Sequence, residues 1–437
     1  MATWGNTITS SGNGREIMNT KNIFKLCVIG SLGMATLGLT LVFNPAPAAA
    51  HGERSQEPFL RMRTAQWYDT RWTPQKTSVN DEAMLSGKMH IAEDWPRAVV
   101  RPNRTFINVG SPSSVFTRLS SKVNGVPMFT SGPMEVGGDY EYVIKLRGRL
   151  PGHHHIHPML AVNGAGPIAG PGGWMDITGN KSDFINPVKL LVGGTIDTET
   201  AGLWTGIFWH ILWGTLGLGW IAWFCVRPMF LIRARVLAQE GGDALLNDPV
   251  DRIAAYVMLG VCFIIIGIGF FTTDAQYPYT VPLQAGAPLI KPTHLQSDLT
   301  MKVLGADYDV PGRALRMTLT VTNNGESPLR IGEFTTAGVR FLNKVGVANN
   351  LDPNYPAEIM ALDGLNMEDD SPINPGETKD IKLDSRDSLW EFQRLMDMVH
   401  DPEQRFGGLV MSWDESGNRH INSISGAIIP VFTRAQG

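Results

Sequence analysis

The chain alternates long polar stretches with three strongly apolar runs. The runs cover residues 26–43, 203–226 and 253–273. The second and third reach the roughly 20 residues at which an α-helix spans the hydrocarbon core of a bilayer. Neither contains an Asp, Glu, Lys or Arg, and the only histidine in them is His210. The pattern therefore predicts two transmembrane helices, at 203–226 and 253–273.

The first apolar run has the features of a secretory signal. Lys21 and Lys25 precede it, and the segment NPAPAAA at residues 44–50 ends it with small side chains at Ala48 and Ala50. This arrangement predicts cleavage before His51, so that residues 1–50 are a signal peptide that is removed. The alternative is an uncleaved membrane anchor.

The charges flanking the apolar runs predict the topology. The loop at 227–252 carries Arg227, Arg233, Arg235 and Arg252. Positive loops remain in the cytoplasm, whereas a signal peptide directs the chain after it across the membrane. Both polar regions, 51–202 and 274–437, are therefore expected in the periplasm of a bacterium, on an inner or intracytoplasmic membrane.

Both polar regions have the pattern of β-rich domains. Residues 316–322 and 140–147 alternate polar and apolar side chains, and 339–342 is another short strand candidate. Asn323-Asn324-Gly325 follows the first of these and is typical of a hairpin turn. Outside the membrane, helix is expected only at 387–398, where apolar residues recur with helical spacing.

Composition excludes several classes of function. The 437 residues have 18% charged side chains and a net charge of −4, which gives no basic surface for nucleic acid. Cys27, Cys225 and Cys262 all lie in apolar runs, so neither polar region can form a disulfide or offer a thiolate ligand.

The glycine-rich stretch 163–173 lacks the Lys-Ser/Thr ending of a phosphate-binding loop, and we expect a surface loop between strands.

Histidines form the strongest chemical signal. Four of the ten lie within residues 153–157, directly before Pro158, which favours an extended backbone. Alternate side chains of an extended segment share a face, so His155 and His157 project together. His153 has the same parity and His154 the opposite one. The alternative is an exposed histidine-rich turn that binds metals adventitiously.

His51 gains a free α-amino group if the predicted cleavage occurs. The amine and its own imidazole can chelate one ion, and His155, His157 or both can add further nitrogens. Such planar nitrogen ligation favours Cu(II), with zinc as the alternative. In contrast, we interpret His90 as a structural histidine in a strand and His210 as an interhelical hydrogen-bonding group.

The residues around these histidines resemble a known family. Residues 51–64, HGERSQEPFLRMRT, closely resemble the mature start of the B subunit of the copper membrane monooxygenases, which include particulate methane and ammonia monooxygenases. The likeness covers essentially all of the chain from His51 and preserves the two-span layout. It also includes the segments 151–157, 164–172, 310–314 and 331–334.

The resemblance implies two periplasmic cupredoxin-like β-barrel domains joined by two transmembrane helices. It implies assembly with monooxygenase subunits A and C, as a trimer of three-subunit protomers. It assigns copper to His51, His155 and His157, and not to His153 or His154. Some members hold a further copper with two histidines; one position matches His90, but the other is Gln66 here.

The resemblance also suggests a substrate. Residues 57–60, 92–97 and 411–424 look more like ammonia monooxygenase, which implies O2-dependent oxidation of ammonia to hydroxylamine. Methane or another short alkane is the alternative substrate. Two other hypotheses remain: a structural copper-binding assembly subunit with catalysis in another subunit, and a copper-delivery protein. No catalytic residue is assigned.

Overall fold

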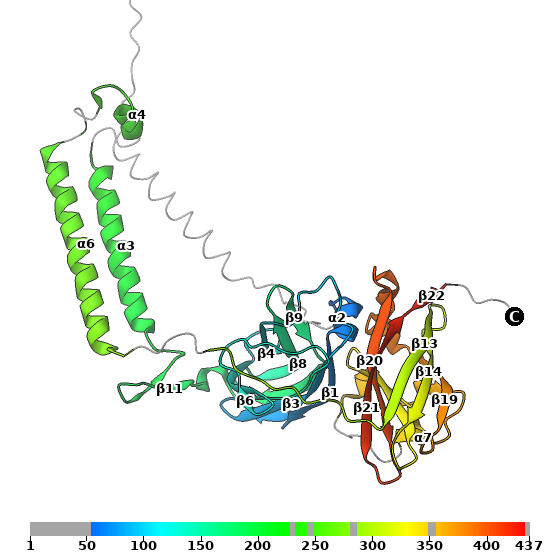
Figure 1. Ribbon diagram of the computed structural model, residues 1–437. Coiled ribbons are helices and arrows are strands. Elements are labelled where there is room, and N and C mark those ends of the chain that lie inside the picture. Colours follow the sequence, from blue (N-terminus) through cyan, green and yellow to red (C-terminus); the bar gives the residue numbers. More distant parts are fainter. Residues whose placement is uncertain are drawn as a thin grey trace, which may run out of the picture. The chain divides into compact units, whose positions relative to one another are not determined.

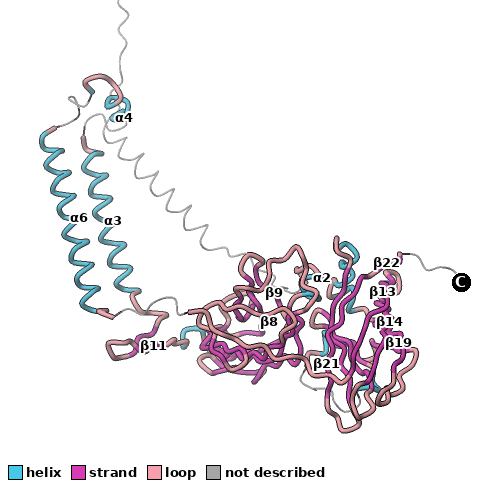
Figure 2. Tube along the Cα trace, in the orientation of Figure 1, coloured by secondary structure: helices cyan, strands magenta, loops and turns pink. Residues whose placement is uncertain are grey.

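β-Strands dominate two regions of the chain, and a pair of long helices lies between these regions in sequence (Figures 1 and 2). The computed structural model describes residues 54–227, 232–242, 246, 248–279, 286–347 and 355–432. The expected signal peptide and His51 lie outside the described residues.

The N-terminal region, residues 54–202, contains two β-sheets around one apolar core. Its strands are β1 (Ala65–Thr73), β2 (Lys76–Ser78), β3 (Glu82–Ile91), β4 (Thr105–Gly110), β5 (Phe116–Val123), β6 (Val126–Pro127), β7 (Asp139–Gly148), β8 (Gly152–Val162), β9 (Gly166–Ala169) and β10 (Gly173–Thr178). One sheet has the order β1-β3-β7-β5-β6; the other has β2-β10-β8-β4, with β9 paired to β8. The core takes side chains from both sheets, among them Leu85, Ile144 and Ile156.

The predicted strand at 140–147 is confirmed as β7. Its buried side chains alternate with more exposed ones, and Tyr142, Ile144 and Leu146 are fully buried. A strand covered on one face needs this period of two, because successive side chains point to opposite faces. After a short 3-10 turn (Lys181–Asp183), a separate hairpin of β11 (Pro187–Lys189) and β12 (Thr195–Asp197) ends the region.

The C-terminal region, residues 299–432, repeats the two-sheet plan. Its strands are β13 (Leu299–Asp309), β14 (Ala314–Asn323), β15 (Arg330–Thr336), β16 (Val339–Leu342), β17 (Met360–Ala361), β18 (Leu365–Met367), β19 (Thr378–Arg386), β20 (Arg405–Trp413), β21 (Arg419–Ala427) and β22 (Ile429–Val431). The sheet orders are β18-β19-β14-β13-β22 and β17-β16-β15-β20-β21. The predicted strands at 316–322 and 339–342 are confirmed within β14 and as β16.

The hairpin predicted at Asn323-Asn324-Gly325 is wrong. β14 pairs with β13 and β19, whereas the next strand, β15, belongs to the other sheet. The Asn323 side chain explains the crossing, since its amide donates to the carbonyls of Ser327 and Ile373 and its oxygen accepts from the Gly325 N–H. These bonds turn the chain out of the first sheet rather than back along it.

Helix outside the two long helices also differs from the prediction. The helix expected at 387–398 is two short pieces, α8 (Leu389–Phe392) and a 3-10 stretch (Leu395–His400). Arg394 between them has φ 55°, which interrupts helical hydrogen bonding. Short helices that the pattern did not predict are α2 (Pro58–Arg63), α4 (Arg233–Leu237), α7 (Lys344–Val347) and the 3-10 turn Ala357–Ile359.

The two long helices are α3 (Leu203–Cys225) and α6 (Pro249–Gln276). Both are long and apolar enough to cross a membrane. They lie antiparallel, because Trp223 near the end of α3 donates to Asp251 near the start of α6 at 2.9 Å, while Trp209 lies against Gly269. Asp248 caps α6 by accepting from the Val250 N–H.

The interhelical role expected for His210 is wrong. Its Nδ1 donates to the carbonyl of Gly206, one turn earlier in the same helix, at 2.7 Å. A ring N–H that bonds to its own helix is satisfied without a partner helix.

Candidate metal centre

His155 and His157 lie next to each other on strand β8. Their ring centroids are 4.6 Å apart with the planes at 86°, and the two residues are 8% and 5% exposed. β8 changes partner between them, since His155 lies opposite Trp174 of β10 and His157 opposite Gly110 of β4. The structure thus brings these two predicted residues together in a buried position.

Each ring has a defined hydrogen-bonding neighbour. The Nδ1 of His157 lies 3.1 Å from the Gly170 carbonyl oxygen, and the Nε2 of His155 lies 3.3 Å from a carboxylate oxygen of Glu358. The second carboxylate oxygen of Glu358 accepts from the Trp174 indole at 3.3 Å. Partners of this kind fix which ring nitrogen carries the proton and how the imidazole is turned.

Gly172 lies directly against both imidazoles. A Cβ atom at this position would overlap the Cε1 atoms of His155 and His157. Any side chain here would therefore displace at least one ring. The backbone of Gly172 thus forms one wall of the histidine pair.

The prediction of a surface loop at 163–173 is wrong for the second half of this stretch. Residues 168–173 are buried, partly in β9 and at the start of β10. A Cβ at Gly170 would lie 2.8 Å from the Trp67 ring, and one at Gly173 would lie 2.7 Å from Trp72. These glycines allow the chain to pass close to two indoles and to the histidines, a use of glycine that the sequence pattern did not reveal.

The structure does not bring His153 and His154 into the pair. His153 has 61% of its side chain exposed, pairs with Asp176 at 2.6 Å and stacks on Trp174. His154 lies 3.2 Å from the Leu150 carbonyl through Nε2. The parity of His153 therefore does not place it with His155 and His157.

Glu358 contributes to the site without any signal in the sequence. It comes from the 3-10 turn Ala357–Ile359 of the C-terminal region, about 200 positions after the histidines that it approaches. No motif surrounds it, and only the folded chain shows its contact with His155.

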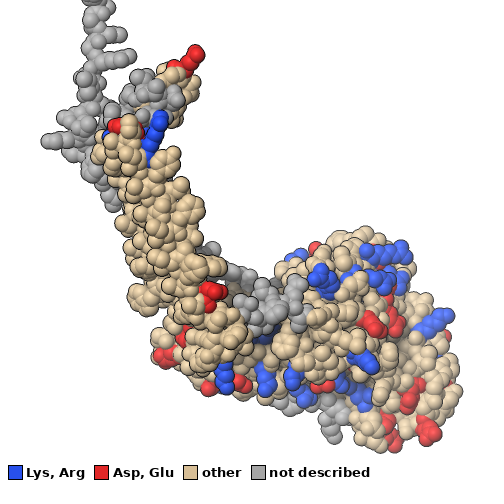
Figure 3. All heavy atoms as spheres, turned by 60° about the vertical axis from the view of Figure 1, so that its left-hand side comes forward, with Lys and Arg blue, Asp and Glu red and all other residues tan. Residues whose placement is uncertain are grey.

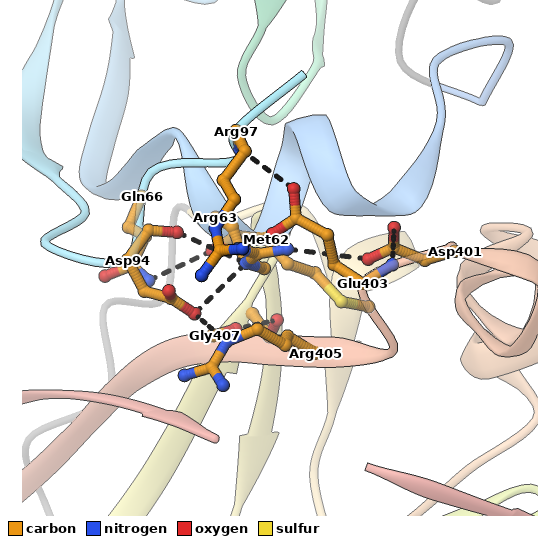
Figure 4. A network of polar contacts seen from close by, with 10 residues as sticks. Met62, Arg63, Gln66, Asp94, Arg97, Asp401, Glu403, Arg405 and Gly407 are labelled. Atoms are coloured by element: carbon orange, nitrogen blue, oxygen red, sulfur yellow. Dashed lines mark hydrogen bonds and ion pairs between the residues drawn. The ribbon is translucent and has the colours of Figure 1, made fainter. Parts of the chain in front are cut away.

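The segment that follows His51 is bound by the C-terminal region. In α2, Arg61 donates to the carbonyls of Gln393 at 2.7 Å and Ala337 at 3.2 Å. Arg63, 1% exposed, pairs with Glu403 at 2.7 Å and Asp401 at 3.5 Å, as Figure 4 shows.

Asp94 completes this network from the N-terminal region. Its carboxylate lies 3.2 Å from Arg63 Nε and 2.6 Å from Arg405 Nε (Figure 4). The hydrogen bond from Arg63 lowers the pKa of Glu403 below its usual value. Because the Arg63 guanidinium is buried, these carboxylates provide the compensation that a buried charge requires.

A second ion-pair cluster joins the same two regions. Asp69 of β1 accepts two hydrogen bonds from Arg419 of β21, at 2.7 and 2.5 Å. Burial opposes ionisation of Asp69, yet the bonds and charge of Arg419 lower its pKa overall. Next to it, Arg340 donates twice to Glu333 at 2.7 and 2.6 Å. Charges thus concentrate where the two regions meet.

His90 is buried in β3, opposite Gln66 of β1 and Asp139 of β7. Neither ring nitrogen has a hydrogen-bond partner among the described residues. Burial lowers its pKa to about 4, with a smaller contribution from His294. Gln66 donates instead to the Met62 carbonyl at 3.0 Å, so the structure offers no second ligand from that position.

No group of three His, Cys, Asp or Glu side chains that could hold a metal occurs within the described part of the chain. The pair His155 and His157 supplies two buried imidazoles, and the third expected ligand, His51, lies outside the described residues. Two adjacent buried imidazoles are donors that suit copper or zinc, and their identity fits the nitrogen site expected from the sequence.

Comparisons with known proteins give matches that cover most of the chain. The profile of a family of monooxygenase B-subunit proteins matches residues 52–432. The particulate methane monooxygenase alpha subunit of Methylococcus capsulatus (Bath) is 39% identical over 404 residues, covering 92% of this chain and 97% of that protein.

Among solved structures, the cupredoxin domain of amoB from Nitrosocaldus yellowstonii is 16% identical to this chain. The match covers 28% of this chain and 91% of that domain, with a TM-score of 0.23. A TM-score this low does not support a fold assignment.

Proposed function

We propose, because this chain belongs to the family of monooxygenase B subunits, that it is the copper-binding subunit of a membrane-bound ammonia monooxygenase. The chain is a subunit of a copper-dependent monooxygenase, and the proposal adds the substrate: ammonia, oxidised with O2 to hydroxylamine. The observation that carries the copper-binding role is the buried pair His155 and His157, against which the backbone of Gly172 lies.

His51, His155 and His157 would hold the copper. In His157, Nδ1 faces the Gly170 carbonyl, so Nε2 of this ring would bind the metal. In His155, Nε2 faces Glu358, so Nδ1 of this ring would bind the metal. Copper when bound would supply one-electron chemistry towards O2.

The remaining residues position and shield these ligands. Gly170 and Glu358 would hold the imidazoles in one orientation each, and burial of both rings would limit access of water. Glu358 would also add a negative charge beside a cationic centre. This copper either performs the oxidation or stabilises the subunit while another subunit reacts, and removal of the ligands distinguishes the two roles.

The substrate assignment has a specific competitor. Residues 57–60, 92–97 and 411–424 favour ammonia by their resemblance. The 39% identity to a methane monooxygenase subunit favours methane as the second candidate. Comparing turnover of the purified complex with each gas at equal O2 separates the two, and preferential oxidation of methane would reject ammonia.

The proposal includes location and assembly. Helices α3 and α6 would cross a bacterial inner or intracytoplasmic membrane, with both β-rich regions in the periplasm as cupredoxin-like barrels. Subunits A and C would complete the protomer, and three protomers the complex. The length and composition of the two helices and the arginines of the loop between them support this arrangement.

Replacing His155 or His157 by Ala in the purified complex tests the metal site. We expect loss of copper from this site by elemental analysis, together with loss of its nitrogen-coupled Cu(II) resonance. His153→Ala is the matched control, because this neighbouring imidazole is exposed and outside the pair. Unchanged copper in both variants would reject the site, and full turnover after copper loss would favour the structural role.

The mature amino terminus provides a separate test. Mass spectrometry of the purified subunit should find His51 as the first residue. Any other first residue would rule out the amino-terminal chelate, while leaving ligation by His155 and His157 to be decided by the alanine variants.

A further inference from the structure

The hairpin of β11 and β12 exposes a cluster of apolar side chains. The two strands form a sheet of their own, joined to no other described strand. Leu191 is 66% exposed, Ile185 53%, Val192 45% and Val188 44%. Single exposed apolar residues are ordinary, but four within one short hairpin form a surface that water solvates poorly.

Asp197 fixes this hairpin to the start of α3. Its carboxylate accepts from the backbone N–H groups of Asn186 at 2.8 Å and Glu199 at 3.1 Å, and its carbonyl accepts from the Ala201 N–H at 2.7 Å. Helix α3 begins at Leu203. Because the base of the hairpin and the turn into the helix share Asp197, the hairpin stays near the entry of α3.

Aromatic side chains mark the same end of the helix pair. Trp204 in the first turn of α3 is 78% exposed, and Tyr279, three residues after the end of α6, is 68% exposed. The helices are antiparallel, so these two positions belong to the same end. Tryptophan and tyrosine concentrate at membrane–water interfaces, so this end corresponds to the headgroup level if the helices span the bilayer.

A further exposed apolar residue of the N-terminal region, outside the hairpin, lies beside the chain that follows α6. Phe129 is 82% exposed. Its neighbour Thr130 donates to the Gly286 carbonyl at 3.2 Å, and Gly132 lies against Pro288. Apolar side chains of this region thus gather near the segments that connect it to both long helices.

We infer that the hairpin formed by residues 185–197 is a membrane-interface anchor that places Leu191 and Val192 among the lipids of the bilayer crossed by α3. The inference rests on the proposed membrane-spanning role of α3 and extends it to the soluble region. Figure 3 shows the helix column as predominantly uncharged, with charged side chains at its ends.

The composition of the hairpin favours lipid over a partner protein. Its tip carries aliphatic side chains and glycines, whereas protein interfaces rely on Trp, Tyr and Arg. Its acidic residue, Asp197, is at the base, and the exposed Lys189 has a stem long enough to reach the headgroups from the flank. This gradient from an apolar tip to a charged base matches the depth profile of a membrane interface.

Photocrosslinking in native membranes tests the anchor. The full complex is prepared with p-benzoylphenylalanine at position 191, and with the same group at Leu304, an exposed leucine of the C-terminal region. We expect lipid adducts on the hairpin peptide at several times the level found at position 304. Copper content and the Cu(II) resonance should remain those of the parent complex.

The outcomes separate the anchor from its premise. Crosslinks from position 191 to another polypeptide, or lipid adducts no more frequent than at position 304, would overturn the anchor. Extraction of the chain from membranes by alkaline carbonate would instead overturn the membrane-spanning premise, and the anchor with it. Neither result depends on whether His155 and His157 bind copper.

Discussion

The two β-rich regions share a two-sheet plan, and both bury aromatic side chains, but they differ in their histidines. Among the described residues, the N-terminal region buries three imidazoles: His90, His155 and His157. The C-terminal region buries an aromatic group in its core, where Trp390 packs against Tyr308 and Phe341 with ring centroids 5.4 and 5.0 Å apart.

The C-terminal region places its functional groups at its boundary instead. Glu358 contacts His155, Glu403 pairs with Arg63, and the Gln393 carbonyl accepts from Arg61. The N-terminal region thus has the candidate ligands, whereas the C-terminal region has groups that hold those ligands and the segment after His51. The proposed metal site therefore belongs to the boundary between the regions, and substitutions on either side of that boundary can test this conclusion.

The largest effect is expected from Arg63→Met. This change leaves Asp401 and Glu403 without their buried cation, and breaking a buried ion pair costs about 3–5 kcal/mol. The apparent melting temperature of the purified complex should fall, and copper at the site should bind more weakly. Lys344→Met is the control, because it breaks an exposed ion pair with Asp363 that is worth at most about 1 kcal/mol. Equal melting temperatures for both variants would contradict the conclusion that the ion pairs of Arg63 stabilise the contact between the two regions.

Gly172→Ala tests the histidine pair without removing a ligand. The added methyl group would overlap both imidazoles, and we expect copper affinity to fall on the order of 100-fold, as when groups that orient metal ligands are disturbed. Competition with a chelator measures this. Gly305→Ala in the C-terminal region is the control, because its Cβ would meet nothing within 4 Å. Equal affinities would show that the wall formed by Gly172 is not required.

His90 should make the N-terminal region sensitive to acid. Its folded pKa of about 4 lies below the ordinary value of 6.5, so the unfolded chain binds the proton first as the pH falls. The stability that neutral His90 contributes is therefore complete above pH 6.5 and decreases towards pH 4, by on the order of 3 kcal/mol. His90→Leu should reduce the fall in melting temperature between pH 6.5 and pH 4. His400→Leu, at an exposed histidine, should leave this fall unchanged. If the melting temperatures of His90→Leu and of the unsubstituted protein fell equally with pH, the proposed contribution of His90 would be refuted.

Glu358→Gln should produce the smallest change. The amide oxygen can still accept from Trp174, but the negative charge beside His155 is lost, so we expect copper affinity about 10-fold lower and shifted Cu(II) resonance parameters. Glu368→Gln is the control, since it neutralises an exposed carboxylate paired with Lys382. A resonance unchanged by Glu358→Gln would confine the site to the N-terminal region.

Local periodicity predicted the parts of the fold that depend on neighbours in sequence. Strands β7 and β14 follow from alternating side chains, and so does the common face of His155 and His157. The prediction of a hairpin at Asn323 was wrong because the side-chain amide of Asn323 turns the chain out of the sheet. The prediction of one helix at 387–398 was wrong because Arg394 takes a left-handed conformation.

The supporting residues of the site could not be predicted for a different reason. Glu358, Asp401 and Glu403 reach His155 and Arg63 only through tertiary contacts, and no spacing along the chain encodes such contacts. Gly172 stood in a glycine-rich stretch whose composition is equally typical of a surface loop. The ligand assignment of His51, His155 and His157 remains a prediction from sequence and resemblance.

The contact between Arg63 and Glu403 spans 340 positions of the chain. With the proposed export from the amino end, the histidines would reach the periplasm long before Glu403, and contacts this distant form late in folding. The proposed metal site would then be completed only after nearly the whole subunit has been translocated. An incomplete chain would present its imidazoles without the contacts that Glu403 and Gln393 make with α2, so firm copper binding is expected only in the completed subunit.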